Sequence, residues 1–170
     1  AALERRAREG GYDEVALTSL STADYSALRE LASGAAAALQ PLDVSLSVSS
    51  LRAVGLDGDL MDSLRTGRAG GLTFAPEAGT QGLRDRINKR ISEEGLIQTA
   101  REAAVRDWTT LKLYFMIGLP TETDADVRSI LTLAERVRLA ARDAAPRRAP
   151  KVTCAVNSFV PKPHTPMQWA

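Results

Sequence analysis

The chain has 170 residues, of which 44% are hydrophobic and 25% are charged, and this balance is typical of one soluble globular domain. Its 22 Lys and Arg residues nearly balance its 21 Asp and Glu residues, so we expect no large basic surface for nucleic acid or for an anionic membrane. No apolar run approaches the ~18 residues that a transmembrane helix needs, and no signal-peptide pattern opens the chain. We therefore expect a cytoplasmic protein whose partner is a small molecule or another protein.

The two ends of the sequence predict a segment of a longer polypeptide. A helix expected over residues 1–10 begins without a capping Ser, Thr, Asp or Asn, and the chain stops at Gln168-Trp169-Ala170 without a polar tail. We expect residues 1–170 to form a single domain excised from a longer chain, with the rest of the same polypeptide as one of its partners.

Strand-like apolar runs alternate with helix-like stretches along the whole chain. The expected strands cover residues 13–20, 42–51, 70–80, 109–120 and 151–161, and the expected helices cover residues 1–10, 21–39, 57–67, 92–108 and 124–145. Repeated strand-helix-strand units imply parallel strands joined by right-handed crossovers. This pattern predicts an α/β fold that is either an open doubly wound sheet or an arc of a (β/α) barrel.

Several common catalytic motifs are missing. The sequence has no GxGxxG turn after a strand and no GxxxxGK[ST] loop, which argues against a dinucleotide fold of the dehydrogenase type and against P-loop chemistry. It has one histidine and one cysteine, so neither a zinc site nor a thiol-imidazole nucleophile is supported. Cys154 is predicted to be a small buried hydrophobic residue, and it cannot hold an iron-sulfur cluster by itself.

Polar or glycine-containing segments lie at the end of every expected strand. In chain order they read TSLS, SVSS, APEAGT, GLPTET and NSFVPKPHTP. Ligands of α/β proteins bind where parallel strands end, because the loops there can vary while the sheet stays fixed. The sequence therefore predicts a binding site at this edge.

Three of these regions carry a family likeness. The segments "LTFAPEAGTQGLRDRINKRISEEGLI", "KLYFMIGLPTETDADV" and "NSFVPKPHTPMQW", in this order and spacing, resemble radical S-adenosylmethionine proteins. The closest likeness is to the iron-sulfur oxidoreductases of that superfamily, in the subgroup that often carries a cobalamin-binding-like domain. The similarity covers nearly the whole chain.

The resemblance implies a fold and a chemistry. The fold would be a partial, TIM-like (β/α) barrel of about five parallel strands with outer helices, and residues 1–170 would be its carboxyl-terminal part. The cofactors would be S-adenosylmethionine and a 4Fe-4S cluster held by a CxxxCxxC loop, with cobalamin as a candidate third. This chain lacks that loop, so its cluster ligands would lie outside it. We expect the full-length protein to be an enzyme that generates a 5′-deoxyadenosyl radical to act on an unknown substrate, and the segment alone to be inactive.

The resemblance also implies cofactor-binding residues, whereas it identifies no catalytic residue and no metal ligand in this chain. The methionine amino group would be contacted by Thr18 and Ser19, although TSLS replaces the family's Gly-Gly-Glu. The ribose hydroxyls would be bound by Glu77. The adenine would lie beside Ile117, Gly118 and Leu119, with further contacts from Ser158, Phe159 and Val160. Each position also has a purely structural interpretation, as a turn, a loop carboxylate or a strand end.

Two other functions stay open at this point. One is a redox-neutral barrel enzyme acting on a phosphorylated small molecule, which predicts an anion near Gly79-Thr80 or Thr121. The other is a non-catalytic barrel used for protein interaction. His164 is expected to be a loop residue. Four basic residues are expected to form a solvated face: Arg84, Arg86, Lys89 and Arg90.

Overall fold

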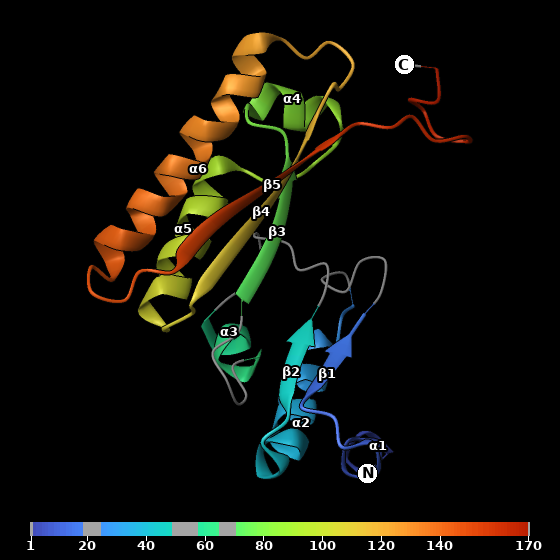
Figure 1. The fold of residues 1–170 in the computed structure, drawn as a ribbon, viewed down its shortest axis with the longest axis vertical. Helices are drawn as coiled ribbons and strands as arrows, with labels where there is room; N and C mark the ends of the chain where they lie inside the picture. Colours follow the sequence, from blue (N-terminus) through green and yellow to red (C-terminus); the bar gives the residue numbers. More distant parts are fainter. Residues whose placement is uncertain (1, 19–24, 49–57, 65–70, 170) are drawn as a thin grey trace.

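The computed structural model describes residues 2–18, 25–48, 58–64 and 71–169, and Figure 1 shows how their helices and strands are arranged. In chain order the elements are α1 (Ala2–Gly10), β1 (Glu14–Leu17), α2 (Leu28–Leu39), the 3-10 helix η2 (Gln40–Leu42), β2 (Ser45–Val48), α3 (Gly58–Leu64), β3 (Gly71–Glu77), α4 (Gln81–Arg86), α5 (Glu93–Val105), β4 (Thr110–Ile117), α6 (Asp124–Ala144) and β5 (Lys151–Ser158). The expected alternation of strands and helices is therefore present, and within the described residues each strand is shorter than the run that predicted it.

The described strands form two separate sheets. β1 pairs in parallel with β2, and β3, β4 and β5 form a three-stranded parallel sheet in that order. The prediction of a partial TIM-like barrel of about five strands is therefore wrong: the five described strands do not share one sheet, and they close no barrel. Parallel pairing and sequential order hold within each sheet.

The split between the sheets has a physical reason that the sequence pattern does not carry. Alternating strands and helices fix the direction of each strand, because a crossover helix returns the chain to the same end of the sheet. They do not fix which strands become neighbours. β1 and β2 pair over only four residues each, whereas β4 and β5 pair over eight, so the backbone hydrogen bonding is concentrated in the second sheet.

One face of the three-stranded sheet packs against α5 and α6, which Figure 1 shows running together along the strands. Residues alternate between buried and more exposed along β3 and β4, as expected for strands with one covered face. The buried side chains that share this core are Leu72, Phe74, Leu111, Leu113 and Phe115 from the strands, and Leu96, Ala100, Ala103, Ile130, Leu133, Val137 and Ala141 from the helices. This packing fixes the strands whose ends carry the predicted site.

The two long helices beside this sheet begin at side-chain caps. Ser92 Oγ accepts a hydrogen bond from the Gly95 amide at 3.1 Å, which confirms the expected start of α5. Thr123 caps α6 in a reciprocal arrangement with Asp126, in which each side chain bonds the backbone of the other residue. The sequence favours Ser21 or Asp24 as the cap of the helix expected over residues 21–39, because their side-chain oxygens can bond amides of a first helical turn. Both residues lie outside the described part of the chain, and α2 begins after Ala27 without a side-chain cap.

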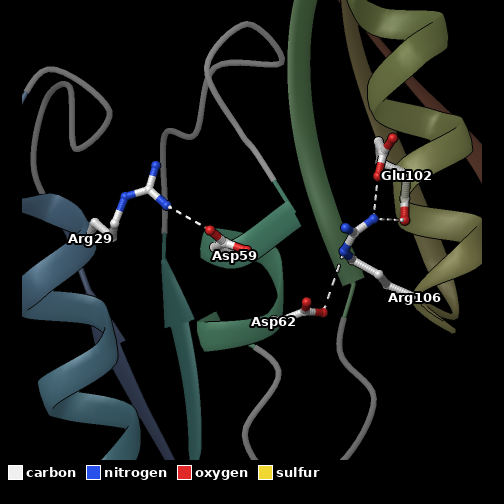
Figure 2. Close-up of polar contacts among 5 residues, drawn as sticks. All are labelled: Arg29, Asp59, Asp62, Glu102 and Arg106. Carbon is white, nitrogen blue, oxygen red and sulfur yellow. Dashed lines mark hydrogen bonds and ion pairs between the residues drawn. The ribbon is translucent and has the colours of Figure 1, made fainter.

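Ion pairs connect α3 to α2 and to the carboxyl-terminal end of α5 (Figure 2). Asp59 lies 3.7 Å from Arg29 of α2, and Asp62 lies 3.4 Å from Nε of Arg106, the residue that follows α5. Arg106 also donates to the carboxylate and to the backbone carbonyl of Glu102 in the preceding helical turn. The side chain of Arg106 thus ties α3 to the layer of helices that covers the three-stranded sheet.

Candidate functional site

The carboxyl ends of β3, β4 and β5 lie at one edge of the three-stranded sheet, and most of the predicted site residues emerge there. Glu77 pairs with Phe115 in the strand ladder, and Ile117 pairs with Ser158. The Phe159 amide donates to the Ile117 carbonyl at 2.8 Å. The structure therefore brings together the segments 77, 117–119 and 158–160. Thr18 is exposed at the end of β1 in the other sheet, and Ser19 lies outside the described residues.

Glu77 leaves the sheet through a backbone irregularity. The β3–β4 register shifts between Phe74 and Glu77, and Glu77 has a φ of 70°, a left-handed conformation that costs energy for a residue with a side chain. Its Oε1 accepts from Lys89 Nζ at 3.1 Å, with side chains 22% and 32% exposed for Glu77 and Lys89, respectively. The candidate ribose ligand is therefore a half-buried carboxylate already paired with a cation.

The loop after Glu77 is fixed against α6. A Cβ atom at Gly79 would collide with the Ser129 hydroxyl and with the backbone nitrogen of Ile130, so only glycine lets the loop lie this close to the helix. The Thr80 hydroxyl donates to Asp126 Oδ1 at 2.6 Å. This hydrogen bond is the largest of the effects that hold the pKa of Asp126 below its usual value, and the hydrogen bonds from Thr123 come next.

The burial of Arg84, in the short helix after this loop, shows that one prediction was wrong. Arg84 was expected on a solvated basic face, together with Arg86, Lys89 and Arg90; Arg86 and Arg90 are exposed and Lys89 is partly exposed, but Arg84 is only 1% exposed. Burial lowers the pKa of Arg84, and Glu93, Asp85 and Glu94 oppose that effect. The sequence analysis missed Arg84 as a residue of the site because Asp85 and Arg86 follow it, and a basic residue in a charged run is typical of an exposed surface.

The turn between β4 and α6 is organised by the carboxylate of Glu122. Glu122 Oε2 accepts from the Gly118 amide at 2.5 Å and from the Leu119 amide at 3.3 Å. Its Oε1 is buried and has no hydrogen-bond partner within the described part of the chain. A carboxylate four residues after a glycine at a strand end was the available sequence signal.

Gly118 and Leu119 have different environments. Gly118 has a φ of 86°, and among the described residues no atom beyond its two chain neighbours lies within 4 Å of a Cβ built there, so one side of this residue is open within that part of the chain. The Leu119 side chain is 4% exposed and packs with Ala78 and Leu83. Leu119 therefore anchors the turn, while the open space beside Gly118 is where a flat group could approach the backbone. Ile117 is half-buried against the main core.

The end of β5 provides the third wall of this edge. Ser158 and Val160 are exposed, and Phe159 is partly buried against the cluster around Leu119. Cys154 is also exposed, so the prediction that it is buried is wrong, because β5 is an edge strand with limited cover. Partial desolvation raises the pKa of the Cys154 thiol. His164 lies in an exposed turn after the strand.

The amino terminus of α6 and the turn before it already carry the chain's own carboxylates. Asp126 bonds the Thr123 amide and the Thr80 side chain, and Glu122 bonds the Gly118 amide. An anionic ligand needs free amide donors at a helix start and a favourable charge there. The positions near Gly79-Thr80 and Thr121 at which a phosphate was expected are thus next to acidic groups, although Arg86 also donates to Thr121 Oγ1 at 2.8 Å.

Comparison with known proteins gives one informative relative. No protein-family model matches the sequence. The chain is 39% identical over 153 residues to the uncharacterized protein MJ0966 of Methanocaldococcus jannaschii, and the match covers 90% of this chain and 31% of that protein. The chain therefore spans about a third of the length of this relative. Within the described residues no helix has the length and apolar character needed to cross a membrane.

The residues at this edge fit part of the expected cofactor. The carboxylate of Glu77, the open backbone at Gly118 and the exposed end of β5 offer contacts for a ribose and an adenine. They do not fit an iron-sulfur cluster, because the sequence holds one cysteine and the described residues include no group of three or more His, Cys, Asp or Glu side chains that could hold a metal ion. The chemistry of this edge is therefore compatible with an adenosyl group, and the described residues show no ligand set for a cluster.

Proposed function

We propose that this chain supplies the adenosyl-binding edge of a radical S-adenosylmethionine enzyme. The observation that carries the proposal is the juxtaposition of Glu77, the open Gly118 turn and residues 158–160 at the end of one parallel sheet. These are the segments whose sequences resemble the radical S-adenosylmethionine family. The proposal concerns binding and orientation, since the described residues contain no candidate cluster ligand set.

The charge at this edge supports a cationic ligand over a phosphorylated one. The carboxylates of Glu77, Glu122 and Asp126 lie at the end of β3, in the turn after β4 and in the first turn of α6, and the last two accept hydrogen bonds from backbone amides there. The sulfonium and ammonium groups of S-adenosylmethionine are positive, so a neighbouring carboxylate attracts them, whereas it repels a phosphate. The redox-neutral alternative is weaker for this reason.

In the proposed enzyme S-adenosylmethionine supplies the 5′-deoxyadenosyl group that becomes the radical. The chain's own residues hold that group: Glu77 accepts hydrogen bonds from the ribose hydroxyls, and the backbone of 118 and 158–160 contacts the adenine. Lys89 competes for the same carboxylate in the structure. The cluster, and cobalamin if it takes part, would bind to residues outside this chain. A cytoplasmic location belongs to the same proposal.

Amide chemical shifts of the isotope-labelled chain test this proposal against both alternatives. Addition of S-adenosylmethionine should shift the amides of residues 77–79, 118–119 and 158–160. Ribose 5-phosphate, added at the same concentrations, should leave them in place. Shifts with ribose 5-phosphate alone, centred on Thr80 or Thr121, would favour the phosphate-binding alternative. No shift with either compound would favour the interaction protein.

A further inference from the structure

The loop that joins Glu77 to Lys89 is closed by one buried guanidinium. Arg84 Nη1 donates to the carbonyls of Ala78 at 3.0 Å and Gly79 at 2.9 Å. Its Nε donates to the carbonyl of Ile91 at 3.1 Å. The first two acceptors directly follow Glu77 and the third lies two residues after Lys89. A single side chain therefore holds both ends of the loop that carries the ion pair.

The geometry of these bonds is specific to arginine. A planar guanidinium presents five donors in fixed directions, whereas an ammonium is a point charge on a flexible chain. Arg84 uses Nη2 as well, which donates to Gln81 Oε1 at 3.0 Å. With a side chain only 1% exposed, water cannot replace these bonds when the arginine is removed.

The rest of the loop has little freedom once Arg84 is in place. Gly79 lies against the backbone of α6, and Thr80 bonds Asp126 at 2.6 Å. Ala78 is fully buried beside Leu83 and Leu119. The backbone of Glu77, strained at a φ of 70°, is thus held from its carboxyl-terminal side by contacts that converge on residues 78–80.

We propose that Arg84 is a positioning residue that aims the Glu77 carboxylate at the ribose of an adenosyl ligand. The inference rests on the proposed function, since it assigns Arg84 a role in that same site. It predicts that recognition of a ribose hydroxyl depends on Arg84, although the guanidinium touches no ligand. A purely structural arginine would instead lower the affinity for every adenosyl ligand equally.

Paired nucleosides separate these two roles. The wild-type chain should bind 5′-deoxyadenosine roughly tenfold more tightly than 2′,5′-dideoxyadenosine, the effect expected from a hydrogen bond to a charged group. In Arg84→Lys this preference should fall to about twofold or less. The exposed Arg101→Lys on α5 is the matched control and should keep the wild-type preference. Calorimetry on chains whose folding is verified by circular dichroism gives both affinities.

A second variant keeps the test decisive if Arg84→Lys fails to fold. Gln81 is exposed, and Gln81→Ala removes the acceptor of Arg84 Nη2 with little change to the core, so it should reduce the preference partially. A tenfold preference that persists in folded Arg84→Lys, or in Gln81→Ala when the lysine variant is unfolded, overturns the inference. If the wild-type chain binds both nucleosides equally, Glu77 does not recognise the ribose 2′-hydroxyl, and the inference about Arg84 is refuted as well. A wild-type chain that binds neither overturns the proposed function itself.

Discussion

The Thr80 hydroxyl donates to Asp126 Oδ1 at 2.6 Å, although the two residues are 46 positions apart in the sequence. The bond joins the loop after β3 to the capping box of α6. Asp126 also accepts from the amide and the hydroxyl of Thr123, at 3.0 and 2.8 Å. One carboxylate therefore holds the start of the longest helix and the loop that carries Glu77.

This bond predicts a pH-dependent effect of Thr80→Val. Because Thr80 and then Thr123 hold the pKa of Asp126 below 3.8, the charged carboxylate contributes stability above that pH, and the contribution is lost as the pH falls through the folded-state pKa. Thr80→Val should lower the urea midpoint at pH 7, and its difference from wild type should shrink at pH 3. Thr80→Ser keeps the hydroxyl and should behave as wild type. A constant difference at both pH values would contradict this linkage.

Replacement by alanine should change stability differently at the two glycines near Thr80, Gly79 and Gly82. Gly79→Ala forces a methyl group into the α6 backbone and should cost about 1–3 kcal/mol in the free energy of unfolding. Gly82, in α4, has nothing within 4 Å of its added Cβ, so Gly82→Ala should be neutral or stabilise by up to about 1 kcal/mol. Urea denaturation of the two variants measures both. Equal effects would show that the loop does not lie against α6.

Removing the Glu122 carboxylate should loosen the turn after β4. Glu122→Ala leaves the Gly118 and Leu119 amides without their acceptor, and we expect a loss of about 1–2 kcal/mol in the free energy of unfolding. Glu122→Gln keeps a carbonyl acceptor and should lose less. Amide hydrogen exchange supplies a local check, since Gly118 should exchange faster in the alanine variant. Unchanged exchange at Gly118 would refute the role of Glu122 in this turn.

The chain alone should not assemble an iron-sulfur cluster. Four-iron clusters are held by several cysteine thiolates, and this sequence has only Cys154. Anaerobic reconstitution with iron and sulfide should therefore give no stable absorbance near a stoichiometric iron content. A stable cluster that disappears in Cys154→Ser would show that Cys154 recruits ligands of another kind.

Local signals in the sequence predicted local structure well. Ser92 and Thr123 cap the expected helices, because a capping side chain and its amide partners lie within four residues of each other. Runs of apolar residues located β4 and β5, and their parallel order followed from the helix between them. The meeting of Glu77, Gly118 and Ser158 at one edge followed from the same rule.

The remaining features depend on contacts that leave no local pattern. The separation of β1 and β2 from the other strands depends on lateral pairing, which alternation does not specify. Arg84 can be buried because it donates to the backbone carbonyls of residues 78, 79 and 91. Every residue has a carbonyl, so no side-chain motif in the sequence predicts these hydrogen bonds. Leu119, expected beside the adenine, packs with Ala78 and Leu83, a contact that no local sequence pattern predicts.

The affinity of the Glu77→Ala variant for 5′-deoxyadenosine tests the central claim most directly. Glu77 is the only carboxylate assigned to the ligand here, and losing hydrogen bonds to a charged group should weaken binding by about 1–3 kcal/mol. Lys89→Met is the matched control: it breaks the same ion pair but leaves the carboxylate, so its affinity should equal or exceed that of wild type. Calorimetry that gives this order supports the adenosyl site, whereas equal affinities for wild type and Glu77→Ala would remove Glu77 from it.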